Sequence, residues 1–179
     1  MKIKMMLFPA AAILLAALVL FGTRTGLKQI GTVRAEAELN EMLSAVLPGS
    51  TSFTWEAYDG EDESIQAVYK GENGFVVQTC TDGYAGEIVM LVGVNKSGEV
   101  QGLVVRQLSE TYGLGAEALT DTKFLSQFLK TAGDAQIGTN VDAITGATVS
   151  SKAIAKAVNA ASAYVTGADT TSSATTWGG

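Results

Sequence analysis

The chain has 179 residues, a formal net charge of −6, one cysteine and no histidine. The missing histidine excludes Ser-His-Asp triads, Cys-His pairs and His-ligated zinc or haem, and one cysteine excludes an internal disulfide and a cysteine-ligated metal or iron–sulfur site. The acidic balance argues against nucleic acid and anionic lipid surfaces as partners. Because histidine is absent and cysteine occurs once, any chemistry must come from hydroxyls, carboxylates, the backbone or a bound cofactor.

A membrane helix is the first predicted element, at residues 1–23. The run MMLFPAAAILLAALVLF, residues 5–21, carries no charge and is interrupted only by Pro9. A membrane span needs about 20 apolar residues and at least about 17, so this run is short but sufficient. Lys2 and Lys4 would also suit a cleaved signal peptide, but no small-x-small cleavage site directly follows the run. We expect an uncleaved, single-pass anchor in the cell membrane, with a cytoplasmic N-terminus and the main domain outside.

A stalk helix is expected next, over residues 24–50, where apolar residues recur at helical spacing up to the Pro48-Gly49 pair. The pattern then changes to short runs rich in β-branched and aromatic residues, separated by turn sequences. These runs predict five strands joined as an antiparallel meander: FTWEAY, SIQAVYK, FVVQTC, EIVMLVGV and VQGLVVRQL. We interpret the cluster DGEDE as a solvated acidic turn and Cys80 as a packed or half-packed strand thiol.

Two helices are predicted after the strands. ALTDTKFLSQFLKTAG, residues 118–133, has an apolar face of Phe and Leu and should end at Gly133. VSSKAIAKAVNAASAYV, residues 149–165, has a stripe of small apolar residues that suits close packing on a sheet. Residues 167–179 are rich in Gly, Ser and Thr and are predicted to be disordered. The fold class is therefore α+β: an anchor, then a domain over residues 51–166 with a mainly antiparallel sheet and packed helices.

Three segments are candidates for the chemistry. DAITGATVSSKA, residues 142–153, gathers hydroxyl side chains where the last helix should begin. A helix start exposes unpaired N–H groups and a positive dipole end, so these hydroxyls are either caps or phosphate contacts; the P-loop pattern is absent. ETYGLG, residues 110–115, has glycines that would let backbone approach a flat ligand, and GYAGEI, residues 83–88, presents a tyrosine. Taken singly, each also fits a plain loop or turn.

Taken together, these segments resemble a known family. GYAGEIVMLVGVNKSGEV, SETYGLG and DAITGATVSSKAIAKAVNAA are similar to the FMN-binding domain of the RnfG family, the G subunits of Rnf-type ion-translocating oxidoreductases. The C subunits of sodium-pumping NADH:quinone oxidoreductases share this domain, but their usually longer domain is less similar to this compact chain. The most specific part is the flavinylation pattern Asp-x-x-Ser/Thr-Gly-Ala-Thr, which is filled in order by Asp142, Thr145, Gly146, Ala147 and Thr148.

The resemblance implies one FMN, linked by a phosphoester to the Thr148 hydroxyl by a flavin transferase that splits FAD. It implies an electron-transfer subunit without independent turnover, in a ferredoxin:NAD+ complex that moves Na+ or H+, with other membrane subunits as partners. It implies no metal site and no catalytic side chain. Further cofactor contacts are expected from Asp142, Thr145, Gly146, Ala147, Val149, Ser150, Glu110, Thr111, Gly113, Leu114, Gly115 and Tyr84.

The chain departs from the family pattern at two points. Tyr112 stands where relatives commonly have proline, and Leu108 and Ser109 stand where a histidine is often found. Both changes concern the pocket wall and not the attachment site. The alternative functions are an FMN-binding domain that serves another respiratory complex or an extracellular flavin reductase, and an anchored binding module without a cofactor.

Overall fold

The computed structural model describes residues 35–108 and 121–168. The chain divides into two compact units, Met1–Leu39 and Asn40–Gly179, and of the first only residues 35–39 are described, all helical. The predicted anchor at residues 1–23 and residues 24–34 of the predicted stalk helix therefore lie outside the described residues, as does the predicted tail from residue 169 on. Within the two described ranges, no helix is long and apolar enough to cross a membrane.

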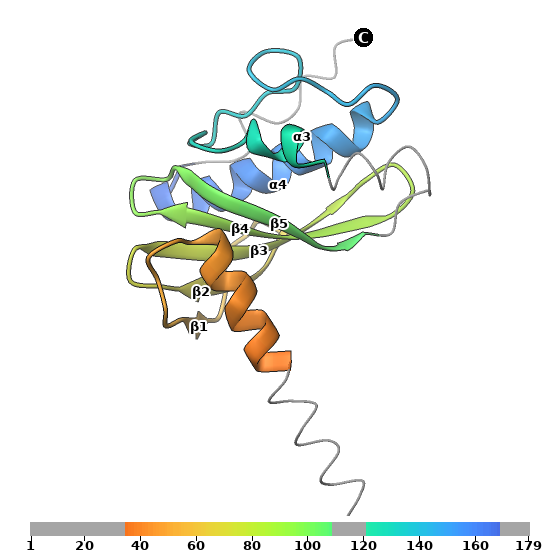
Figure 1. The fold of residues 1–179 in the computed structure, drawn as a ribbon. Helices are drawn as coiled ribbons and strands as arrows, with labels where there is room; N and C mark the ends of the chain where they lie inside the picture. Colours follow the sequence, from red (N-terminus) through yellow and green to blue (C-terminus); the bar gives the residue numbers. More distant parts are fainter. Residues whose placement is uncertain (1–34, 109–120, 169–179) are drawn as a thin grey trace, which may run out of the picture. The chain divides into compact units, whose positions relative to one another are not determined.

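Five strands form one antiparallel sheet in the order β1-β2-β3-β4-β5 (Figure 1). The strands are β1 Thr54–Glu56, β2 Ile65–Lys70, β3 Gly74–Asp82, β4 Glu87–Asn95 and β5 Val100–Leu108. Each strand pairs with the one before it, so the predicted meander is confirmed. Turn chemistry makes these connections short: Asn95 Oδ1 accepts hydrogen bonds from the N–H groups of Ser97 and Glu99.

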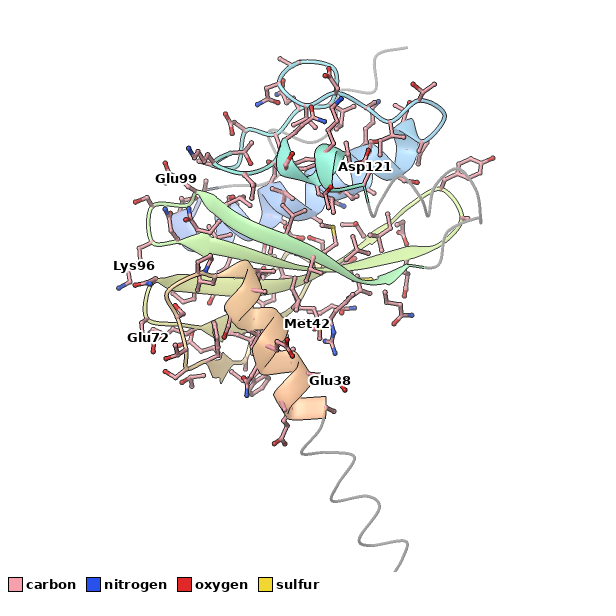
Figure 2. The ribbon with its side chains drawn as sticks, viewed as in Figure 1. Glu38, Met42, Glu72, Lys96, Glu99 and Asp121 are labelled. Carbon is pink, nitrogen blue, oxygen red and sulfur yellow. The ribbon has the colours of Figure 1, made fainter. Side chains whose placement is uncertain are left out.

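One end of the sheet carries charged turns. Figure 2 shows Glu72 at the β2–β3 turn and Lys96 and Glu99 at the β4–β5 turn, all at the same end. The Glu72 carboxylate accepts hydrogen bonds from the Thr51 N–H at 3.0 Å and the Ser52 hydroxyl at 2.9 Å. Hydrogen bonding from its own backbone, and then from Ser52, lowers the pKa of Glu72. These contacts hold the segment before β1 against the β2–β3 turn.

Helix α4, Thr148–Thr166, covers one face of the sheet (Figure 1). The predicted helix over residues 149–165 is confirmed, with one further residue at each end. Small side chains let the helix lie close to β3, where the Thr81 hydroxyl donates to the Ala153 carbonyl at 3.2 Å. The shared core contains alternate residues of β4 and the apolar stripe of α4: Ile88, Met90, Val92, Val94, Ala153, Ile154, Ala157, Val158, Ala160 and Ala161.

The opposite face of the sheet receives the end of the helix over residues 35–46. Gly93 and Gly102 are cross-strand partners on this face, and a Cβ on Gly93 would fall 2.0 Å from the Val46 carbonyl oxygen. Real Cβ atoms do not approach that closely, so only glycine lets the helix backbone rest here. Leu43 and Leu47 are each 1% exposed. The helix ends before Pro48-Gly49, as predicted, and Gly49 has a left-handed φ of 84°.

The helix predicted over residues 118–133 ends earlier than predicted, and its residues 118–120 lie outside the described residues. Helix α3 covers only Thr122–Ser126, capped by the Asp121 side chain, and residues 127–130 form turns. Lys130 has a left-handed φ of 69°. Its N–H donates to the Val100 carbonyl at 2.9 Å, and the Val100 N–H donates to the Thr131 carbonyl, also at 2.9 Å. Pairing with the start of β5 thus overrides the local helical pattern. The predicted apolar face still reaches the core through Phe124 and Phe128.

Candidate functional site at the start of helix α4

A tight turn, Ile144–Ala147, leads directly into α4. The Ala147 N–H donates to the Ile144 carbonyl at 2.9 Å, and Gly146, the third residue of the turn, has a φ of 83°. Positive φ at the third residue alone is type II geometry, which favours glycine at that position. Thr145 occupies the second position of the turn and is exposed.

Ser151 ties this turn to the first turn of α4. Its Oγ accepts a hydrogen bond from the Ile144 N–H at 3.2 Å and donates to the Ala147 carbonyl at 2.9 Å. The Ser151 N–H donates to the same carbonyl, also at 2.9 Å, which is the first backbone bond of the helix. The residue is fully buried, at 0% exposure. The sequence pattern predicts only that hydroxyls in this segment cap the helix or contact a phosphate. It does not predict the hydrogen bond from Ile144 to Ser151, because that bond forms only when the turn is folded.

Thr148 is the first residue of α4, and it is exposed. Ala147 occupies the N-cap position without a side-chain cap, and no hydrogen bond of the Thr148 side chain is found among the residues that the structure describes. The N–H groups of Thr148 and Val149 have no acceptor within the helix, as at any helix start. The peptide dipoles of this 19-residue helix sum to a helix dipole whose positive end lies at Thr148. The electrostatic field at this helix start therefore favours a negative charge.

The other predicted contacts in this segment divide into exposed and buried residues. Asp142 is exposed, and its N–H donates to Gln127 Oε1 at 2.8 Å, which ties the loop to the end of α3. Val149 is 47% exposed, whereas Ala147 and Ser150 are 5% and 1% exposed. Thr148 and Val149 are thus presented outward, while Ala147 and Ser150 fasten the same turn to the domain.

The β3–β4 hairpin lies at the same end of the domain as the start of α4 (Figure 1). β3 is longer than predicted, so the turn between β3 and β4 is limited to residues 83–86. The Gly83 N–H donates to the Gly86 carbonyl at 2.8 Å and closes this turn. The bond from Thr81 to Ala153 fastens the hairpin base beside the second turn of α4. Tyr84, in the hairpin turn, is 77% exposed.

The third predicted segment follows β5. Ile88 of β4 pairs with Leu108, so β5 ends beside the base of the same hairpin. The chain therefore leaves the sheet at the end where Thr148 lies. The remaining predicted contacts lie outside the described residues: Glu110, Thr111, Gly113, Leu114 and Gly115.

A cavity lies at the other end of α4, away from Thr148. Its lining includes Tyr58, Tyr164 and Gly167, and it contains none of the predicted cofactor contacts. Burial, and then the charges of Glu56 and Asp59, raise the pKa of Tyr164. The start of α4, by contrast, exposes Thr148 and Val149 on the surface.

Comparison with known proteins adds two findings. Residues 83–163 match the model of the FMN-binding domain, a range that runs from the β3–β4 hairpin to the last turn of α4 and includes Thr148. The chain is also 32% identical over 177 residues to the G subunit of the ion-translocating oxidoreductase complex of Methanosarcina acetivorans. That match covers 91% of this chain and 92% of the relative.

Two further relatives match over shorter lengths. The G subunit of the Na(+)-translocating ferredoxin:NAD(+) oxidoreductase complex of Acetobacterium woodii is 34% identical over an alignment of 111 residues, and the match covers 54% of each chain. The G subunit of the proton-translocating ferredoxin:NAD(+) oxidoreductase complex of Clostridium ljungdahlii is 38% identical over an alignment of 109 residues, and the match covers 56% of this chain and 58% of the relative. The chain thus spans little more than half of these two relatives. Because the Methanosarcina match extends over almost the whole chain, the protein belongs to the family of G subunits of ion-translocating oxidoreductase complexes.

Proposed function

We propose that this protein is the electron-transfer subunit of a membrane-bound, ion-translocating oxidoreductase complex and that it carries FMN as a phosphoester on Thr148. The observation that carries the proposal is the position of Thr148 within an FMN-binding domain. Its exposed hydroxyl stands at the first residue of a 19-residue helix, directly after a glycine-dependent turn. It is also the final residue of the flavinylation pattern.

The residues around Thr148 fit a phosphodiester. The first turn of α4 contains no acidic residue, so no carboxylate there repels the phosphate. Lys152 is exposed and lies four residues after Thr148, which places both on one face of the helix. A negative charge at a helix start is stabilised by about 0.3–1 kcal/mol. Gly146 has no side chain to obstruct the approach to the hydroxyl.

The protein's own contribution to attachment is a correctly placed nucleophile. In the proposed step the Thr148 hydroxyl attacks the FMN phosphorus of FAD, held by a flavin transferase. The Oγ1–P bond forms, the bond from that phosphorus to the AMP phosphate breaks, AMP leaves, and the hydroxyl proton passes to a base of the transferase. No oxidant or reductant is needed.

Once attached, FMN would supply reversible one- and two-electron redox chemistry. The chain's residues hold the cofactor in place. Thr148 and the N-terminal amides of α4 bind the phosphate. Val149 and Tyr84 are exposed apolar surfaces at the same end of the domain and are proposed to contact the rest of the cofactor, with the segment over residues 110–115.

The relatives' names support the class of complex. Two of them are subunits of ferredoxin:NAD(+) oxidoreductases, one Na(+)-translocating and one proton-translocating. We therefore propose that this chain relays electrons in a complex of that type, with other membrane subunits as partners and the flavin transferase as a maturation partner. The predicted anchor at residues 1–23 would hold the FMN domain on the outer side of the cell membrane.

Co-expression with a flavin transferase tests the attachment. The wild type, Thr148→Val and the control Thr139→Val are compared by in-gel flavin fluorescence after denaturation and by the mass of the modified peptide. Thr139 is also an exposed threonine, but it lies in the loop before the flavinylation pattern. The wild type and Thr139→Val should fluoresce, and Thr148→Val should be dark. A dark wild type, or a fluorescent Thr148→Val, contradicts the proposal.

A further inference from the structure

The Ser151 side chain contacts both ends of the turn that precedes Thr148. Its Oγ accepts from the Ile144 N–H at 3.2 Å at the start of the turn and donates to the Ala147 carbonyl at 2.9 Å at its end. Ser151 is fully buried, so water cannot replace these contacts. One hydroxyl thus connects the turn, the helix start and the domain interior.

We infer that Ser151 is a positioning residue for the modification of Thr148. Its hydroxyl holds the Ile144–Ala147 turn against α4 and so presents Thr148 as the first helical residue in one orientation. The inference rests on the proposed function, because it concerns the attachment of FMN. It assigns a role to a residue outside the Asp-x-x-Ser/Thr-Gly-Ala-Thr pattern and with no exposed surface of its own.

Ser151 matters for attachment because the Ile144–Ala147 turn is conformationally flexible by itself. Without the Ser151 hydroxyl, the Ile144 N–H loses its acceptor, and the turn is closed only by the bond from the Ala147 N–H to the Ile144 carbonyl. Gly146 readily adopts other backbone conformations, so it would not hold the geometry by itself. Phosphoryl transfer requires the hydroxyl to lie near the attacked phosphorus in a narrow range of orientations. A mobile turn therefore lowers the rate of attachment.

Ser162 provides a matched control in the same helix. Like Ser151, it is fully buried at 0% exposure, but its Oγ has no hydrogen-bond partner within the described part of the chain. Ser162→Ala and Ser151→Ala therefore remove the same group from the same helix at equal burial. Only Ser151→Ala removes the contacts to the turn.

The test measures the rate of FMN attachment to the full-length protein with purified flavin transferase, FAD and Mg2+. Ser151→Ala should slow attachment about tenfold, the factor that corresponds to about 1.4 kcal/mol, and Ser162→Ala should leave the rate unchanged. Amide hydrogen exchange before attachment gives a second readout. The Ile144 N–H should exchange faster in Ser151→Ala than in the wild type, whereas amides in the middle of α4 should not.

The inference is overturned if Ser151→Ala is modified at the wild-type rate or if Ser162→Ala slows modification equally. If circular dichroism shows that Ser151→Ala does not fold, Ser151→Cys decides, since its thiol fills nearly the same space but is a much weaker hydrogen-bond donor and acceptor than the hydroxyl. It should also slow attachment, and a wild-type rate would overturn the inference. A wild type that is never modified refutes the proposed function; a modified wild type with an equally fast Ser151→Ala refutes only the role of Ser151.

Discussion

At the scale of single residues, two threonines of β3 face α4 in different hydrogen-bonding states. The Thr81 hydroxyl donates to the Ala153 carbonyl, whereas the Thr79 hydroxyl, at 0% exposure, has no partner in the described part of the chain. A buried hydroxyl without a partner costs free energy that a hydrogen-bonded one does not. The two positions therefore contribute to stability with opposite sign.

Valine, which has nearly the shape of threonine, tests this difference at both positions. Thr79→Val should raise the free energy of unfolding by about 1 kcal/mol, and Thr81→Val should lower it by about 1 kcal/mol. Urea denaturation followed by circular dichroism measures both. If both substitutions changed the free energy of unfolding equally, the hydrogen bond from Thr81 to Ala153 would not contribute to stability as predicted.

Cys80 shows, also at the residue scale, how the local environment changes the pKa of a thiol. The thiol is half-buried in β3, as predicted. Burial, and then the charges of Glu87 and Asp82, raise its pKa, so the thiolate is disfavoured at neutral pH. The Cys80 thiol is therefore a poor nucleophile in this position.

At the scale of elements, the sheet uses glycine to receive the helix end over residues 40–46. Comparing Gly93→Ala with Gly138→Ala separates the loss of stability caused by a steric clash from the loss caused by an unfavourable backbone angle. A Cβ at Gly93 would meet the Val46 backbone, whereas a Cβ at Gly138 meets nothing within 4 Å but has to tolerate a φ of 84°. Gly93→Ala should lower the free energy of unfolding by about 3 kcal/mol. Gly138→Ala should lower it by about 1–2 kcal/mol.

Chemical denaturation of both variants under one set of conditions gives the comparison. If Gly93→Ala is no less stable than Gly138→Ala, the helix end does not rest on the Gly93–Gly102 pair. The contact matters for the layered arrangement because it covers the face of the sheet that α4 leaves open, where Val76 and Leu91 are each 0% exposed.

At the scale of the whole molecule, the proposed function requires attachment to a membrane. The apolar run of residues 5–21 is the only uncharged stretch of that length in the sequence. The full chain should remain in the membrane fraction through a high-salt wash, and a chain that lacks residues 1–23 should be soluble. Fractionation followed by immunoblotting measures both. Release of the full chain by salt would contradict an inserted anchor and indicate electrostatic attachment instead.

Much of the fold followed from local pattern. Antiparallel neighbours joined by short turns leave few alternatives for pairing, so five β-rich runs predicted the meander. Helical spacing predicted α4 because its buried stripe of alanines recurs along its own axis, from Ala153 to Ala161. The flavinylation pattern likewise named Thr148 because it is a contiguous string whose meaning does not depend on distant residues.

What the tertiary structure alone decided depends on contacts between residues far apart in the chain. α3 ends early because Lys130 and Thr131 pair with Val100, which no local propensity encodes. The need for glycine at position 93 arises from the Val46 backbone, and the proposed role of Ser151 rests on its hydrogen bond to Ile144 in the folded turn. The sequence by itself thus determined the elements and the residue proposed to carry the cofactor. Tertiary structure determined how that residue is held and presented, because burial and hydrogen-bond geometry exist only once the segments have packed.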